Sequence, residues 1–192
     1  MNATIIHISD LHFHTYPHNF REWKSKRVLG AANLLLRRAG QFPLQRAKRL
    51  VEQIQKMKWD HLVISGDLTQ LSLEREFALT RETLEPLLKD PERVTIIPGN
   101  HDRYIKQDEK PDLYKKYFGE FFGGKEIHVR KLNPDWVIVG WDSAHPNDWL
   151  SAGDTVRRST IQATEDLLRS FPEKTRFVIG NHDRGSPYHR AA

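Results

Sequence analysis

Three short segments of this sequence place potential metal ligands directly after apolar, β-branched runs. They are Asp10-Leu11-His12, Gly66-Asp67 and Gly99-Asn100-His101-Asp102. The first pairs a carboxylate with an imidazole two residues away, the second adds a carboxylate, and the third adds an amide oxygen and an imidazole. This mixed oxygen and nitrogen donor set suits Mn, Fe or Zn. The pattern indicates a divalent metal site, of the kind in which two ions lie roughly 3.5–4 Å apart.

The apolar runs that precede these segments predict the strands that must position them. Residues 4–8, 61–65 and 94–97 are short and rich in β-branched side chains. Between them, apolar residues recur at intervals of three and four over 44–57 and 73–88, which predicts amphipathic helices. Strand, helix and strand in succession predict a parallel sheet, whose carboxyl ends share one edge. We expect the three segments to converge at that edge, although one such Asp alone is also a common turn or helix-capping residue.

The second half of the chain continues the mixed α/β pattern. Residues 111–122 predict a short helix rich in aromatic residues, and 160–170 predict another helix. Residues 127–132 and 136–139 predict a hairpin around the turn tripeptide Asn133-Pro134-Asp135. A last strand is predicted at 176–179.

Length and composition limit the class of protein. The chain has 192 residues, of which 38% are hydrophobic and 29% charged, so we expect one globular domain over 1–192. It has no cysteine, which excludes disulfides and thiolate metal ligands. No apolar stretch approaches the roughly 20 residues that cross a bilayer, and the first residues do not resemble a signal peptide. We therefore expect a cytoplasmic protein.

Residues 20–50 form a strongly basic insert. They contain nine Lys or Arg residues and a single acidic residue, Glu22, in a chain whose net charge is +5. An apolar stretch over 28–36 lies inside this basic segment. Two interpretations are equally open: an amphipathic helix that lies on the anionic inner face of the membrane, or a helix that packs on the domain.

The three segments, in this order at predicted strand ends, resemble those of the calcineurin-like metallophosphoesterase superfamily, in particular its small bacterial-type branch. The resemblance implies a layered α/β/β/α sandwich that holds two divalent ions. It implies that Asp10 and His12 bind the first ion, that Asp67 bridges both, and that Asn100 binds the second. His182, which follows the last predicted strand, resembles the next ligand of the second ion.

The resemblance also implies catalytic and substrate-binding roles. His101 matches the catalytic histidine of the family, and we expect Asp102 to orient it. Asn100 and Arg103 are expected to contact the substrate. The family then continues to a Gly-His-x-His motif that this sequence lacks, so we expect a chain that is truncated or altered near Ile179 and that binds its ions weakly.

The implied reaction is hydrolysis of a phosphodiester or pyrophosphate by a metal-bound hydroxide. We expect a phosphorylated small molecule or a lipid-linked substrate, such as a nucleotide-sugar lipid or a cyclic nucleotide. The basic insert favours an amphipathic substrate over nucleic acid, which leaves a nuclease as the alternative within this class. The alternative outside it is a catalytically incomplete fragment or a non-enzymatic binding domain.

Overall fold

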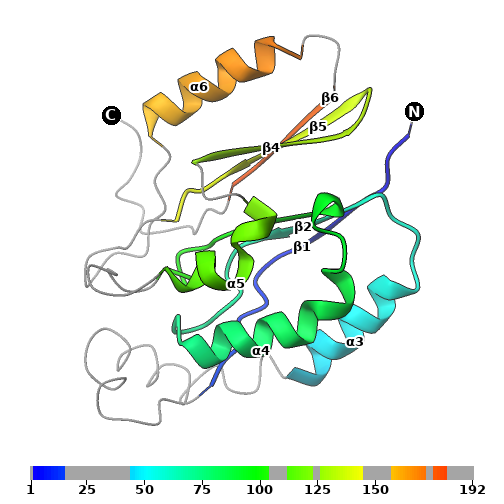
Figure 1. Ribbon diagram of the computed structural model, residues 1–192, viewed down its shortest axis with the longest axis vertical. Helices are drawn as coiled ribbons and strands as arrows, with labels where there is room; N and C mark the ends of the chain where they lie inside the picture. Colours follow the sequence, from blue (N-terminus) through cyan, green and yellow to red (C-terminus); the bar gives the residue numbers. More distant parts are fainter. Residues whose placement is uncertain are drawn as a thin grey trace, which may run out of the picture.

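Two three-stranded sheets pack face to face between two layers of helices (Figure 1). The computed structural model describes residues 2–15, 44–103, 112–122, 126–144, 157–171 and 175–180. Helices α3 (Leu44–Gln55), α4 (Glu74–Leu84) and α5 (Leu113–Phe122) cover the outer face of the first sheet, and α6 (Arg158–Arg169) covers the second. The expected α/β/β/α sandwich is confirmed.

The first sheet contains β1 (Ile5–Ile8), β2 (His61–Ser65) and β3 (Val94–Ile97) in that order. All pairings are parallel, as predicted. Every residue of the central strand β2 is buried, and its side chains alternate between the two faces. Leu62 and Ile64 pack on the helices, whereas Val63 packs toward the second sheet.

The second sheet contains β4 (Ile127–Asn133), β5 (Trp136–Trp141) and β6 (Thr175–Ile179). The predicted hairpin is confirmed: β4 pairs antiparallel with β5, and the backbone N–H of Asp135 donates to Asn133 Oδ1 across the turn at 2.8 Å. Strand β6 pairs parallel to β5, so the two strands end at the same edge.

The two sheets approach closely at Gly140. A Cβ atom there would lie 3.0 Å from Ile97 Cγ2 and 3.3 Å from the Phe122 ring. Both distances are shorter than ordinary van der Waals contact. Glycine at this position therefore lets β5 approach β3 without displacing Ile97 or Phe122.

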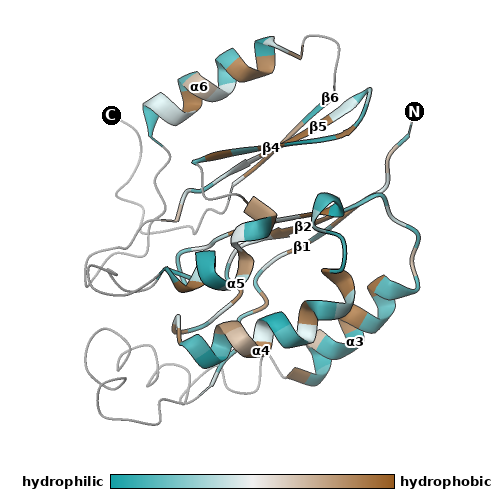
Figure 2. Ribbon diagram, viewed as in Figure 1, coloured by the Kyte–Doolittle hydropathy of each residue, from teal (hydrophilic) through white to brown (hydrophobic). Residues whose placement is uncertain are grey.

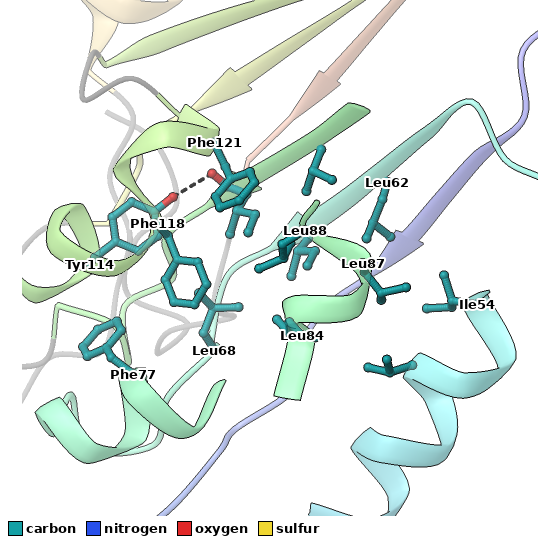
Figure 3. Close-up of a cluster of buried hydrophobic side chains, with 14 residues drawn as sticks. Ile54, Leu62, Leu68, Phe77, Leu84, Leu87, Leu88, Tyr114, Phe118 and Phe121 are labelled. Carbon is teal, nitrogen blue, oxygen red and sulfur yellow. Dashed lines mark hydrogen bonds between the residues drawn. The ribbon is translucent and has the colours of Figure 1, made fainter. Parts of the chain in front are cut away.

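The main core lies between the first sheet and its helices (Figure 3). Phe118 of α5 is fully buried, and its ring centroid lies 6.2–6.5 Å from those of Phe77, Tyr114 and Phe121. The Tyr114 hydroxyl donates to the Ile96 carbonyl at 2.6 Å, which satisfies the polar end of a buried ring. These aromatic contacts fix α5 on β3.

The helices are amphipathic, and Figure 2 shows hydrophilic and hydrophobic residues alternating along α3, α4 and α6. None of the helices within the described ranges is long and apolar enough to cross a bilayer; α3 and α6 have 12 residues each. The helix expected at 28–36 and the predicted ligand His182 lie outside the described residues.

Candidate metal centre

The three predicted segments meet at the carboxyl ends of β1, β2 and β3. We refer to residues 9–15, 66–73 and 98–103 as the first, second and third loops. The first two loops continue the parallel pairing of their strands, because the N–H groups of His12 and Phe13 donate to the carbonyls of Asp67 and Leu68, both at 2.8 Å. This pairing sets His12 beside Asp67.

The backbone at these positions is unusual. Asp10, His12 and Asp67 have φ angles of 56°, 45° and 51°, in the left-handed region that side chains disfavour. Gly66, with φ of 77°, adopts this region without strain. Non-glycine residues in this region cluster at functional sites, where surrounding contacts hold them. Three of the expected ligands share this conformation.

The imidazole of His12 lies between two carboxylates. Its Nε2 atom is 3.9 Å from Asp10 Oδ1 and 3.9 Å from Asp67 Oδ2. The side chains of His12 and Asp67 are buried, whereas that of Asp10 is 61% exposed and reaches into solvent. A potential ligand atom of His101 joins those of His12 and Asp67 within 4.8 Å of one another. The cluster offers one carboxylate and two imidazoles to a cation.

Asn100 provides a direct test of whether a cation fits. The residue is 6% exposed, and its buried Oδ1 atom has no hydrogen-bond partner among the residues that the structure describes. A buried amide oxygen without a partner is costly, and a divalent ion would satisfy it. Together with the buried carboxylate and imidazoles, this oxygen completes a donor set that suits a transition-metal ion.

The ring of His101 is held by Gln70. Its Nδ1 atom lies 2.8 Å from the backbone carbonyl oxygen of Gln70. A carbonyl can only accept, so this geometry assigns the proton to Nδ1, and Nε2 of the neutral ring carries the lone pair. The rings of His101 and His12 meet edge to face, with centroids 5.0 Å apart. The Nε2 lone pair can therefore accept a proton or bind a metal ion.

Asp102 was expected to orient His101, but the structure shows a different use of its carboxylate. The side chain is fully buried and accepts hydrogen bonds from the backbone N–H groups of Gly99, Leu68 and Thr69 at 2.8–3.2 Å. The Thr69 hydroxyl donates as well, at 3.0 Å. Burial raises the pKa of Asp102 above its ordinary value, while these hydrogen bonds act in the opposite direction. Asp102 ties the third loop to the second.

The sequence analysis did not single out Gln70. Its position three residues after Asp67, in the second loop, was the one sequence feature that pointed to it. Which loop carbonyl contacts His101, however, depends on how both loops fold. Gln70 itself is fixed because its N–H donates to the Phe13 carbonyl at 3.0 Å.

Arg103 as a substrate contact stays a prediction, and the structure shows which groups it contacts within the chain. Its Nη2 atom pairs with Asp142 at 2.8 Å and with Asp112 at 3.4 Å, and its Nη1 donates to the Ala144 carbonyl at 3.1 Å. The side chain is 20% exposed. Asp142 directly follows β5, so Arg103 joins the third loop to the edge of the second sheet.

His182 remains a prediction. Gly180, the last described residue, follows β6 at the edge where β5 ends beside Asp142. The end of β6 therefore lies on the side of the molecule that carries the three loops.

Comparison with known proteins identifies the family of this chain. A family model described as calcineurin-like phosphoesterase matches residues 3–139. A crystal structure of a dimetal phosphatase from Danio rerio is similar in fold, with a TM-score of 0.61 and 13% sequence identity over 93% of this chain and 69% of that one. The search of curated proteins found no match. Since the family match spans most of the sequence and all three loops, this chain belongs to the calcineurin-like phosphoesterase family.

Proposed function

We propose that this chain is a metal-dependent phosphoesterase that hydrolyses a phosphodiester or a pyrophosphate. Family membership supports phosphoester hydrolysis as the reaction class. The observation that carries the proposal is the convergence of His12, Asp67 and His101, together with the buried, unpartnered Oδ1 atom of Asn100, which precedes His101 in the chain. These groups come from three different loops, and His12, Asp67 and Asn100 provide donors of the kind that a divalent ion requires.

Asp10, His12, Asp67 and Asn100 would hold two divalent ions, with His182 as a further predicted ligand. Asp67 is the candidate bridging ligand. One of its oxygens, Oδ1, accepts the backbone N–H of His101 at 3.1 Å, while Oδ2 faces His12. When bound, such ions polarise phosphoryl oxygens and lower the pKa of water so that it can attack phosphorus.

His101 is the candidate proton donor to the leaving oxygen. The Gln70 carbonyl fixes Nδ1 as a donor, so Nε2 is the atom that gains and gives up the transferable proton. Asp102 is too deeply buried to touch a substrate, and we assign it a role in positioning the loop of Asn100 and His101.

The proposed substrate class is inferred from the basic and apolar residues of the basic insert. Nine basic residues around an apolar stretch within 20–50 favour a phosphorylated ligand with a lipid part, such as a nucleotide-sugar lipid, and a peripheral place on an anionic membrane. Cyclic nucleotides are the small-molecule candidates. Asn100 and Arg103 are the proposed substrate contacts in the third loop, and the ion pair with Asp142 holds the Arg103 side chain in place.

An assay of phosphodiester and phosphomonoester hydrolysis tests the proposal. Bis-p-nitrophenyl phosphate and p-nitrophenyl phosphate are compared with Mn²⁺, Zn²⁺, Mg²⁺ or EDTA. We expect diester hydrolysis with Mn²⁺ that EDTA abolishes, and its loss in Asp67→Asn. The exposed Glu74→Gln, on the surface of α4, is the control. Turnover that persists in EDTA contradicts the proposal, and metal binding without turnover of either ester indicates a binding domain.

A further inference from the structure

Glu76, in the first turn of α4, has a carboxylate that is completely buried. It accepts three backbone hydrogen bonds. Oε2 receives the N–H groups of Leu71 and Leu73 at 2.8 and 3.2 Å, and Oε1 receives the N–H of Thr15 at 3.1 Å. The bond to Leu73 is ordinary helix capping. The bond to Thr15 is not, because Thr15 belongs to the first loop, 61 residues earlier.

The turn that Glu76 holds is strained and touches the third loop. Ser72 has a φ of 53° and lies between Leu71 and Leu73, the two residues bonded to Oε2. The Ser72 hydroxyl donates to the Asp102 carbonyl at 2.9 Å. Glu76 therefore connects the first loop to the second, as Asp102 connects the second to the third.

The first loop has particular need of such a connection. It carries Asp10 and His12, both with positive φ, a conformation that persists only when surrounding contacts enforce it. Backbone pairing with the second loop holds its middle, at His12 and Phe13. Glu76 holds its last described residue, Thr15. A glutamine at position 76 could not accept all three of these hydrogen bonds, because its NH₂ group would face at least one backbone N–H donor.

We propose that Glu76 is a positioning residue of the metal centre: it fixes the first loop against the second and so preorganises His12 and Asp67 before an ion binds. This inference rests on the metal centre proposed above. Residues that orient metal ligands typically contribute about 10- to 100-fold to metal affinity. Glu76 acts through the loop backbone rather than through contact with substrate.

Binding of Mn²⁺ by titration calorimetry tests the proposal on the full chain. Glu76→Gln is compared with Glu74→Gln, which removes the same charge from the same helical turn but at an exposed site paired with Lys116. We expect affinity to fall about 10- to 100-fold in Glu76→Gln and to change less than about twofold in Glu74→Gln. Wild-type affinity in Glu76→Gln would overturn the proposal.

Amide hydrogen exchange without metal provides a second readout. In Glu76→Gln, exchange should accelerate in residues 10–15 and 67–73 but not in the hairpin of β4 and β5. Equal acceleration everywhere would show a role in overall stability alone and overturn the proposal. In the wild-type protein the Thr15 amide should be protected, and rapid exchange there would also overturn it. Absence of Mn²⁺ binding by the wild type would refute the proposed function. The exchange results would still test whether Glu76 fixes the first loop against the second.

Discussion

The two sheets of this protein differ in how extensively their helices pack against them. The first sheet packs on α3, α4 and α5 through a core of fully buried aliphatic and aromatic side chains, and two buried carboxylates tie its strand-end loops together. The second sheet is covered by α6, whose buried residues are only Thr160 and Thr164. Ile161 and Val178 are 42% and 40% exposed. The four proposed ligands that the structure describes, Asp10, His12, Asp67 and Asn100, follow strands of the tightly packed sheet, where their geometry can be fixed within the tolerance that metal binding requires.

Replacing the candidate bridging ligand should have the largest effect. Asp67→Asn removes a negative ligand from both proposed ions, so we expect loss of bound metal and of all metal-dependent turnover. His101→Ala should retain metal but lose about 10²- to 10⁴-fold in kcat. Elemental analysis and kinetics separate the two variants. Equal loss of metal in both would mean that His101, which lies close enough to His12 and Asp67, is itself a ligand.

Removing an aromatic side chain from the first sheet's core should cost more stability than removing an apolar one from the second layer. Phe118→Ala should lower the free energy of unfolding by about 3–5 kcal/mol, because the ring is fully buried among three others. Ile161→Ala, on the exposed face of α6, should cost less than about 1 kcal/mol. Urea denaturation measures both, and similar costs would refute the contrast between the sheets.

Acid should weaken the contact between the sheets through His61 of β2. Burial lowers the pKa of His61 to about 4, and the positive charges of Arg130, Arg93 and His128 act in the same direction, with Glu92 opposing. The unfolded chain takes up this proton near the ordinary pKa of about 6.5, so stability should fall by about 2 kcal/mol from pH 7 to pH 5.

The matched variant is His61→Gln, which does not titrate and can still bond to the Thr95 hydroxyl that His61 contacts at 2.9 Å. Urea denaturation of both proteins at pH 7 and pH 5 should show a smaller pH effect in the variant. An identical pH dependence would place the acid sensitivity elsewhere.

Gly140→Ala should cost less stability than loss of the Phe118 ring. The added methyl group meets Ile97 and the Phe122 ring, and both side chains can shift by a few tenths of an ångström. We expect a cost of about 1–2 kcal/mol. If Arg103 holds the sheet edges in register, combining Gly140→Ala with Arg103→Met should cost more than the sum of the single changes. Strictly additive costs would show that the two contacts act independently.

The order of the strands and α-helices, and the convergence of three segments at one sheet edge, could be predicted from the sequence, but the 3-10 helices Glu85–Leu87 and Pro91–Arg93 were not predicted. These features follow from local periodicity and from the rule that parallel strands end together. The hairpin could be predicted for the same reason, because the residues that form its turn are adjacent in the sequence.

The sequence did not reveal which polar groups meet within the site, because these contacts form between distant parts of the chain. Arg103 pairs with Asp142, Gln70 rather than Asp102 holds the His101 ring, and Glu76 reaches Thr15. Each contact joins residues more than 30 positions apart. No local pattern specifies such partners, because they depend on how the loops turn after their strands end and on how closely the two sheets pack.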